Sequence, residues 1–263
     1  MSEPLILSAS SVGTFLRCGY QWYAAYVLRI KSPPSVKQVL GIAAHDAVEL
    51  NYRQKVETHL DLPVTEVIDS FSDSYDRQVV DVDDPDEDPG KAKDSGVGLV
   101  RLYHTEVAPP IQPEYVEQEV KFAIDGQPWS GYIDLATTDK AIRDTKTTGR
   151  TPSDTTQYSI AMTGYALGYR HMTGAKEADV VLDFLIRTKT PKYLPVSSNG
   201  PINDAAIATF ADVVHDVALS IEAGRFLPNG LYSQACSWCG FTKICPALKA
   251  SRSFALGTTS ERD

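Results

Sequence analysis

Two aspartates and a lysine in one predicted hairpin have the chemistry of a cation site. Two predicted strands are joined by a polar turn, with Asp134 on the first strand and Asp144 on the second. Because side chains alternate along a strand, Asp144 and Lys146 point to one face and Thr145 points away. Carboxylate oxygens suit Mg²⁺ or Mn²⁺, and hydrolysis benefits from a cation near the attacking water. A surface salt bridge would also explain an isolated Asp-x-Lys, so the surroundings of this pattern decide its meaning.

Four cysteines, one near the start and three near the end of the chain, form a second candidate site. The chain begins without a basic, apolar leader, so we expect a cytoplasmic protein with reduced thiols. By count, four thiolates suit Zn²⁺ or an iron–sulfur cluster. Zinc ribbons usually have two C-x2-C pairs, so the one-plus-three arrangement favours a [4Fe–4S] cluster. The four residues are Cys18, Cys236, Cys239 and Cys245.

His45 lies on a predicted helix over residues 36–57, where apolar residues recur at helical spacing. Its neighbours Ala43, Ala44 and Ala47 are small and would let a bulky group approach. By itself this pattern leaves two interpretations open, a metal ligand and a structural histidine.

Taken in order, these patterns resemble the PD-(D/E)XK nuclease superfamily. The resemblance rests on Gly-x-x-x-His at Gly41–His45, Gly-x-Ile-Asp at Gly131–Asp134, Asp-x-Lys at Asp144–Lys146, and the placement of the cysteines. Within the superfamily, the chain is similar to the RecB-like branch that carries an iron–sulfur cluster. That branch includes the CRISPR-associated iron–sulfur exonucleases, AddB-type nuclease domains and phage exonucleases. Residues 17–23 also resemble its first cysteine motif, and the similarity runs from about residue 8 to residue 248.

The resemblance implies an α/β fold with a restriction-endonuclease-like core, in which helices flank a mixed central sheet. The expected domains are an N-terminal helical region (1–110), the nuclease core (111–225), a C-terminal cysteine cap forming an Fe–S module (226–250) and a flexible tail (251–263). Periodicity and turn signals predict the elements of this core. The predicted helices cover 8–28, 36–57, 65–79, 96–105, 155–172 and 203–222, and the predicted strands cover 115–124, 128–137, 141–146 and 178–187.

The resemblance also implies roles for individual residues. Asp134 and Asp144 would hold Mg²⁺ or Mn²⁺ together with the backbone carbonyl of Thr145. His45 would add a nitrogen ligand, which shifts the preference toward Mn²⁺. Lys146 would orient the attacking water or stabilise charge on the phosphate.

One family motif fits incompletely. The family places a Gln four residues before a Tyr on the helix after Asp-x-Lys. Tyr165 suits the Tyr position, but Ala161 stands where the Gln belongs. Gln157 lies one turn further back on the same predicted helix face and is our candidate for part of that role. Glu119, on the preceding strand, is a candidate outer carboxylate or an ordinary surface residue.

Composition limits the choice of partners. The chain has 263 residues, 43% of them hydrophobic, which is enough for one substantial domain with or without a small module. A net charge of −9 argues against a generic DNA-coating protein, although an acidic stretch at 81–88 supplies much of the excess and is predicted to be a solvated loop. No apolar run is long enough to span a bilayer. A nuclease needs only a local basic groove, with Arg17 and Arg150 as DNA-binding candidates; further candidates are Arg29, Lys31, Lys146, Arg187, Lys189 and Lys192.

The sequence therefore predicts a metal-dependent DNA exonuclease that acts on single-stranded ends and is stabilised by a [4Fe–4S] cluster. The alternative is a nucleic-acid-binding subunit of a helicase–nuclease or spacer-acquisition assembly. The chain has no Walker-type phosphate loop, so a motor would have to be a partner protein. A zinc-stabilised binding protein is a third possibility.

Overall fold

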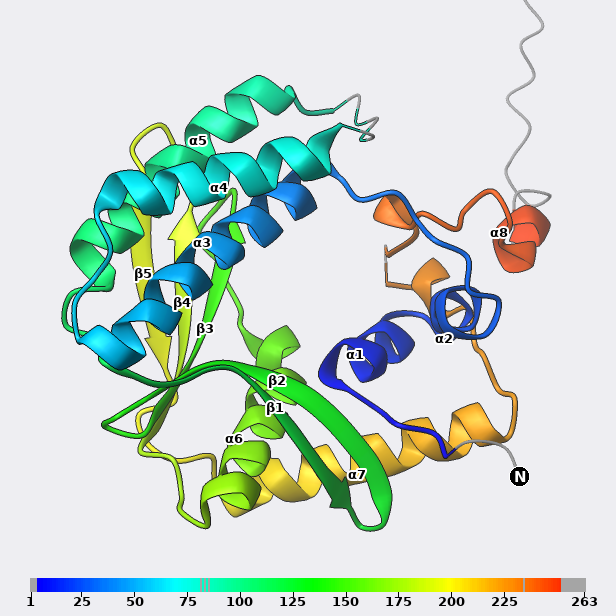
Figure 1. The fold of residues 1–263 in the computed structure, drawn as a ribbon. Coiled ribbons are helices and arrows are strands. Elements are labelled where there is room, and N and C mark those ends of the chain that lie inside the picture. The colour runs from blue at the N-terminus through cyan, green and yellow to red at the C-terminus, as the bar shows by residue number, and fades with distance from the viewer. Residues whose placement is uncertain (1–3, 81, 83, 85, 234, 252–263) are drawn as a thin grey trace, which may run out of the picture. The chain divides into compact units, whose positions relative to one another are not determined.

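The computed structural model describes residues 4–80, 82, 84, 86–233 and 235–251. Its contacts divide the chain into two units (Figure 1). Among the described residues, the larger unit comprises those of 4–9 and 33–215, and the smaller comprises those of 10–32 and 216–251. In this division, residues 33–110 group with the sheet. Of the tail expected at 251–263, residues 252–263 lie outside the described part.

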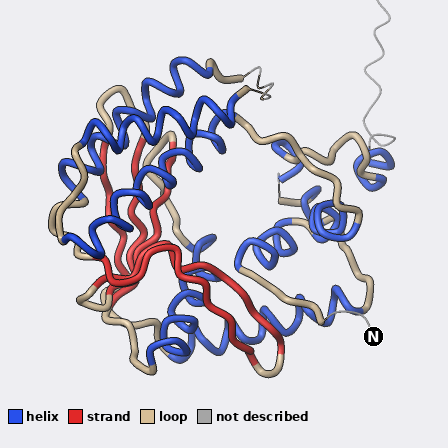
Figure 2. Tube along the Cα trace, in the orientation of Figure 1, coloured by secondary structure: helices blue, strands red, loops and turns tan. Residues whose placement is uncertain are grey.

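A mixed sheet forms the centre of the larger unit (Figure 2). In the described residues it has the strand order β1-β2-β3-β4-β5, with β3 and β4 parallel and the other neighbours antiparallel. The mixed sheet is consistent with the expected α/β fold. The sequence did not predict β5. This strand contains Pro195 and lies at an edge of the sheet, where proline is tolerated. The strands are β1 (Pro113–Ile124), β2 (Gln127–Thr137), β3 (Ala141–Thr148), β4 (Asp179–Ile186) and β5 (Lys192–Ser197).

Helices cover both faces of this sheet (Figure 1). Along β4, Leu185 packs with the helices α3, α4 and α5, whereas its neighbours Phe184 and Ile186 pack with α6. This alternation is the expected result of a strand buried on both faces. The helices of the larger unit are α3 (Val36–Thr58), α4 (Val64–Val79), α5 (Pro89–Leu102), η2 (Tyr103–Val107), η3 (Thr156–Tyr158), α6 (Ser159–Thr173) and most of α7 (Asp204–Glu222).

Local signals explain where these helices begin. Ser35 and Gln38 form a capping box at the start of α3, with the Gln38 amide N–H 3.3 Å from the Ser35 hydroxyl oxygen. Helix α5 begins at Pro89, seven residues before the predicted start at residue 96. Asp88 caps it by accepting a hydrogen bond from the Lys91 amide, and Pro89 suits the first helical position.

The smaller unit contains α1 (Ala9–Arg17), α2 (Gly19–Trp22), η1 (Tyr23–Val27), η4 (Asn229–Leu231), η5 (Ala235–Trp238) and α8 (Pro246–Ser251). The single helix predicted over 8–28 is wrong, because its axis is interrupted at Cys18. The backbone of Cys18 is extended, with φ −165° and ψ 115°, so one helix ends before it and another begins after it.

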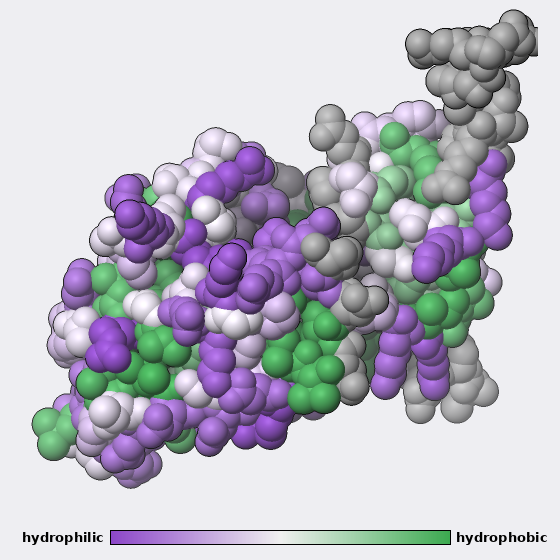
Figure 3. Space-filling model, turned by 90° about the horizontal axis from the view of Figure 1, so that it is seen from above, coloured by the Kyte–Doolittle hydropathy of each residue, from purple (hydrophilic) through white to green (hydrophobic). Residues whose placement is uncertain are grey.

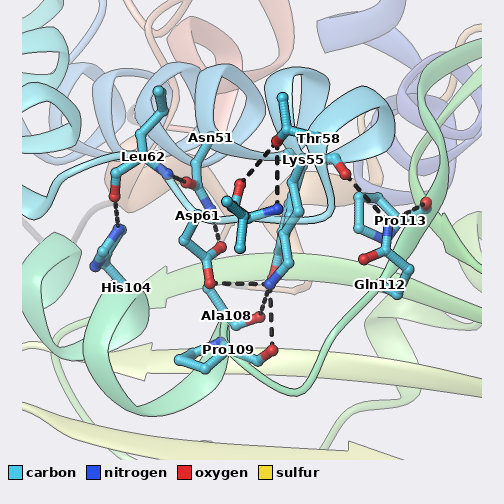
Figure 4. A network of polar contacts seen from close by, with 12 residues as sticks. Asn51, Lys55, Thr58, Asp61, Leu62, His104, Ala108, Pro109, Gln112 and Pro113 are labelled. Atoms are coloured by element: carbon cyan, nitrogen blue, oxygen red, sulfur yellow. Dashed lines mark hydrogen bonds and ion pairs between the residues drawn. The ribbon is translucent and has the colours of Figure 1, made fainter.

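A buried lysine anchors the C-terminal half of α3 (Figure 4). The Lys55 ammonium lies 2.9 Å from Asp61 and donates to the backbone carbonyls of Ala108 and Pro109 at 2.8 and 3.2 Å. Asn51, one turn earlier, donates to the other oxygen of Asp61 at 2.8 Å. A buried ammonium must be satisfied in this way to be tolerated. The network fixes α3 against the segment that leads into β1, and these two elements carry side chains of the candidate site.

Within the described residues, no helix is both long and apolar enough to cross a lipid bilayer. The face drawn in Figure 3 intersperses hydrophilic with hydrophobic residues. A folded protein always exposes part of its apolar surface, because its polar residues are too few to cover it.

Candidate active site and cysteine cluster

Strands β2 and β3 separate at the two candidate aspartates. The strands pair Ala136 with Ile142 and Leu135 with Arg143, and in this register the next pair would be Asp134 and Asp144. The pairing ends there, while β3 continues beside β4. The two carboxylates therefore face each other at a fork in the sheet, in side-chain hydrogen-bonding contact.

Asp144 and Lys146 share one face of β3, as side-chain alternation predicts. Asp144 is completely buried, and the Lys146 ammonium lies 2.7 Å from each of its carboxylate oxygens. The Thr145 side chain instead contacts the Tyr103 hydroxyl. The ammonium thus sits directly beside the fork.

Helix α3 brings His45 to the same place. Its Nε2 lies 3.0 Å from Asp134 Oδ2. The neighbours Ala43, Ala44 and Ala47 are fully buried, so their small side chains allow the helix to pack closely there. The His45 imidazole is partly exposed and faces carboxylates.

Glu117 is a fifth acidic or basic group at the fork, and the sequence did not reveal it. In the β1–β2 register it lies opposite Asp134, and its Oε1 is 3.3 Å from His45 Nε2. Glu117 has φ +50°, a left-handed conformation that is costly for a residue with a side chain. Its Oε1 is buried yet accepts no hydrogen bond. Glu117 therefore offers an unused ligand atom to the site.

The sequence pointed instead to Glu119, two residues along the same strand. Glu119 is exposed and pairs with Lys121 at 2.8 Å. No residue pattern distinguishes Glu117 from Glu119, because the left-handed turn that redirects Glu117 is a property of the strand's tertiary setting.

Burial and close packing shift the protonation of these groups. Burial raises the pKa of Asp144 to about 8, and the charge of Asp134 adds to this shift. Burial alone would lower the pKa of His45, but its hydrogen bond and charge pairing with Asp134 raise the value to about 9. Burial also raises the pKa of Glu117 to about 7, an effect that His45 partly offsets. At neutral pH the site therefore retains protons that a bound cation would displace.

The donor set suits a hard or borderline divalent cation. His45, Glu117 and Asp134 each offer one ligand atom, and these three atoms lie within 4.8 Å of one another. Imidazole and carboxylate ligands fit Mn²⁺ and Mg²⁺ sites. Asp144 adjoins this trio through its contact with Asp134.

The structure places the two residues of the incomplete family motif differently. Tyr165 is largely buried on α6, and burial together with the charge of Asp134 raises its pKa well above the usual range. We predicted that Gln157 lies on the same helix as Tyr165. It lies instead in the 3₁₀ turn that precedes α6, where it is exposed. Gln157 therefore does not share a helix face with Ala161 and Tyr165, as the predicted continuous helix required. Tyr158, which was not a candidate from the sequence, is half-buried near the fork. Its hydroxyl interacts electrostatically with Lys146 and Asp144.

The four cysteines gather within the smaller unit, and all are free thiols. Burial raises the pKa of Cys236, and the neighbouring thiols of Cys239, Cys18 and Cys245 raise it further. Cys18 and Cys245 are each 8% exposed. The fold thus brings the first cysteine to the other three, and the mutual repulsion of their thiolates is what a bound cation or cluster would relieve.

Packing around α2 holds Cys18 in place. The Gly19 amide donates to the Asn229 side chain at 3.0 Å, and Asn229 donates to the Leu16 carbonyl at 2.8 Å. A Cβ on Gly19 would lie 2.7 Å from the Leu227 backbone nitrogen, so glycine is needed at this close approach. Four thiols suit zinc or an iron–sulfur cluster equally well as donors, so the set fits the expected cluster without excluding zinc.

The two arginines predicted to bind DNA are both exposed. Arg150 follows β3 in the larger unit, where its amide donates to Thr148 Oγ1 at 3.4 Å. Arg17 ends α1 in the smaller unit, close enough to Cys239 that its charge favours the thiolate.

Comparisons with known proteins agree with this architecture. The model of the PD-(D/E)XK nuclease superfamily matches residues 6–246. No curated protein matches the chain. A solved structure from Eubacterium rectale, described as a "putative exonuclease", has a TM-score of 0.62 at 12% identity and covers 94% of this chain and 88% of its own. At this identity the likeness shows the fold alone. The structure of SSO0001 has a TM-score of 0.39 at 13% identity, with 83% of this chain and 88% of that chain covered, and supports no argument.

Proposed function

Because the chain belongs to the PD-(D/E)XK nuclease superfamily, we propose that it is a metal-dependent DNA exonuclease acting on single-stranded ends. One observation carries the proposal. Helix α3, which is distant in sequence from β2 and β3, contributes to the same fork of the sheet as these two strands. The side chains that meet there are His45, Asp134, Asp144 and Lys146. A surface salt bridge would not need a buried carboxylate pair and a histidine on a third element.

The cation of this proposal is Mn²⁺ or Mg²⁺, held by His45, Asp134, Asp144 and the carbonyl of Thr145, with Glu117 as a further ligand. A bound cation would polarise the scissile phosphate and lower the pKa of a coordinated water. Asp134 and Asp144 supply the negative charge that makes the pocket selective for a dication. His45 must lose its proton to coordinate, because a protonated imidazole has no free lone pair.

Lys146 has a separate role in this proposal. Its ammonium, fixed at 2.7 Å from Asp144, is positioned to stabilise negative charge on the phosphate or to orient the attacking water. Tyr165, nearby on α6, keeps its proton because of its burial and the adjacent carboxylates. It can therefore donate a hydrogen bond to a phosphate oxygen.

We also propose that Cys18, Cys236, Cys239 and Cys245 hold a [4Fe–4S] cluster with a structural role. Phosphodiester hydrolysis transfers no electrons, so the cluster has no redox step to perform. Its expected effect is to stabilise the smaller unit, because metal binding adds its free energy to folding. The gathering of the four thiols supports this proposal.

The test is digestion of labelled linear DNA by the full chain and by its Asp144→Ala variant, with Mn²⁺ or Mg²⁺. We expect the variant to lose about a thousandfold or more in rate, as several kcal/mol of metal-assisted stabilisation would disappear. Asp212→Ala, which removes an exposed carboxylate from α7, is the matched control. Near-normal digestion by Asp144→Ala would overturn the site.

Circular DNA tests the requirement for an end. We expect linear single strands to be degraded and circular ones to stay intact. Equal cutting of circles would refute the exonuclease assignment, and preferred digestion of duplexes would refute the strand preference. Tight DNA binding without any cleavage would favour the alternative, a nucleic-acid-binding subunit.

A further inference from the structure

A cavity with two cationic side chains in its lining lies at the ends of β3 and β4, away from the fork. Its volume is about 230 Å³, and a second cavity of about 540 Å³ shares Gly149 and Arg187 with it. Together they form a groove that crosses Arg187 and reaches Lys189. The smaller cavity is lined by Lys37, Leu40, Thr147, Thr148, Gly149 and Arg187.

Helix α3 connects this cavity with the candidate metal site. Lys37, Gly41 and His45 follow one another at intervals of four residues and so share one helix face. With a rise of 1.5 Å per residue, Lys37 lies about 12 Å along the axis from His45. Gly41, midway, allows α3 to approach β3, since a Cβ there would lie 3.2 Å from Thr147 Oγ1. A single strand of DNA engaged at the fork could therefore reach the cavity.

Two cations of the cavity share one carboxylate. Arg187 Nη1 forms an ion pair with Glu87 Oε1, and Lys37 Nζ lies 3.7 Å from Glu87 Oε2. Glu87 is 13% exposed, and its buried Oε2 accepts no hydrogen bond. The Arg187 side chain is also mostly buried, at 18% exposure. Glu87 Oε2 therefore has room for another partner, and a phosphate offers more oxygens to the two cations than this single carboxylate does.

Glu87 belongs to the acidic stretch at 81–88, which the sequence predicted to be a solvated loop. In the described residues of that stretch, Asp84 Oδ2 accepts a hydrogen bond from the Val36 amide at 3.0 Å, at the first residue of α3. A carboxylate is favourable at a helix N-terminus. Two acidic residues of the stretch thus contact the beginning of α3 and its neighbouring cations, instead of facing only solvent.

We propose that this cavity is a binding subsite for a phosphate group of the DNA strand, and that Glu87 pairs with the two cations of the subsite until the phosphate replaces it. Arg187 and Lys37 hold the phosphate, and the hydroxyls of Thr147 and Thr148 are close enough to line it. Glu87 lowers the affinity of the subsite by competing for the same two cations. This inference rests on the proposed function, because it takes DNA as the ligand.

The test is binding of a short fluorescein-labelled single strand to the metal-free full chain, followed by fluorescence anisotropy at several salt concentrations. We expect Glu87→Gln to bind more tightly than the parent. Arg187→Gln should bind about tenfold more weakly, as expected for loss of a charge-assisted hydrogen bond. The slope of its log affinity against log salt concentration should become shallower by about one released counterion. Glu66→Gln and Arg101→Gln, both at exposed helix positions, are the matched controls.

Arg187→Gln leaves Glu87 buried without its partner and could impair folding, so the double variant Glu87→Gln/Arg187→Gln completes the design. We expect it to lose affinity relative to Glu87→Gln alone. If Glu87→Gln weakens binding, or if the double variant binds as tightly as Glu87→Gln, the subsite is refuted. Strands with and without a terminal phosphate identify the source: a loss confined to phosphorylated ends indicates an end phosphate, and an equal loss indicates a backbone phosphate. If the parent neither binds nor cleaves DNA, the proposed function itself fails; if it does both while the variants match their controls, only the subsite fails.

Discussion

The protonation of the fork predicts a steep pH dependence of metal binding. In the metal-free protein, His45 has a pKa raised to about 9 and Asp144 a pKa raised to about 8. Both groups therefore carry a proton at neutral pH, and a cation must displace both to use them as ligands. Because raised pKa values mean competition with protons, affinity must increase as the pH rises.

The magnitude follows from the number of protons released. Between about pH 7, where Glu117 has lost its proton, and about pH 8, release of two protons makes the apparent dissociation constant of Mn²⁺ fall about 100-fold per pH unit, or about 2.7 kcal/mol. The pH dependence of the Mn²⁺ dissociation constant should weaken between about pH 8 and 9, because Asp144 and then His45 lose their protons in the metal-free protein.

Isothermal titration calorimetry in two buffers of different ionisation enthalpy measures the protons released. His45→Gln and Asp144→Asn should each reduce the release by about one proton and bind Mn²⁺ more weakly. His215→Gln, at an exposed position on α7, is the control and should behave like the parent. A pH-independent affinity, or no proton release by the parent, would refute the assignment of these two residues as ligands.

Three further predictions concern strain, stability and the cysteines. Glu117→Gly should raise the melting temperature of the metal-free protein, since glycine relieves about 1–2 kcal/mol of left-handed strain at an entropic cost of about 0.5–1 kcal/mol. The same variant should bind Mn²⁺ more weakly. Glu119→Gly, the control, should lower the melting temperature and leave the Mn²⁺ affinity unchanged. Because the folded-state pKa values of His45 and Asp144 are both raised, their contribution to stability is full below the unfolded-state pKa values of about 6.5 and about 3.9, and it is lost progressively as the pH rises to about 9 and about 8. Thermal melts without metal should show this loss, and added Mn²⁺ should reverse it. Cys18→Ala should give a colourless protein of low solubility, and unchanged iron and sulfide content in a stable variant would exclude Cys18 as a ligand.

Much of the fold was predictable because its signals are local. The capping box at Ser35 and the apolar spacing of α3 involve residues that are close in sequence. The predicted helix over 36–57 therefore agrees with the observed α3 to within one residue. The strands that carry Asp134 and Asp144 were found for the same reason, from β-favouring residues between turn signals. Errors occurred where distant contacts override local preference. Cys18 interrupts a continuous helical pattern because its neighbours bond to the segment around Asn229.

The sequence by itself determined which residues have the chemistry of a nuclease site, because residue type and strand alternation need no tertiary information. It placed Asp144 and Lys146 on one face of a strand, and the structure has them there. Only the tertiary structure decided that β2 and β3 part at the aspartates and that α3 brings His45 within 3.0 Å of Asp134. It also decided that Glu117, rather than Glu119, faces the fork. That choice depends on a positive φ within β1, a conformation that glutamate does not prefer and that only surrounding contacts can impose.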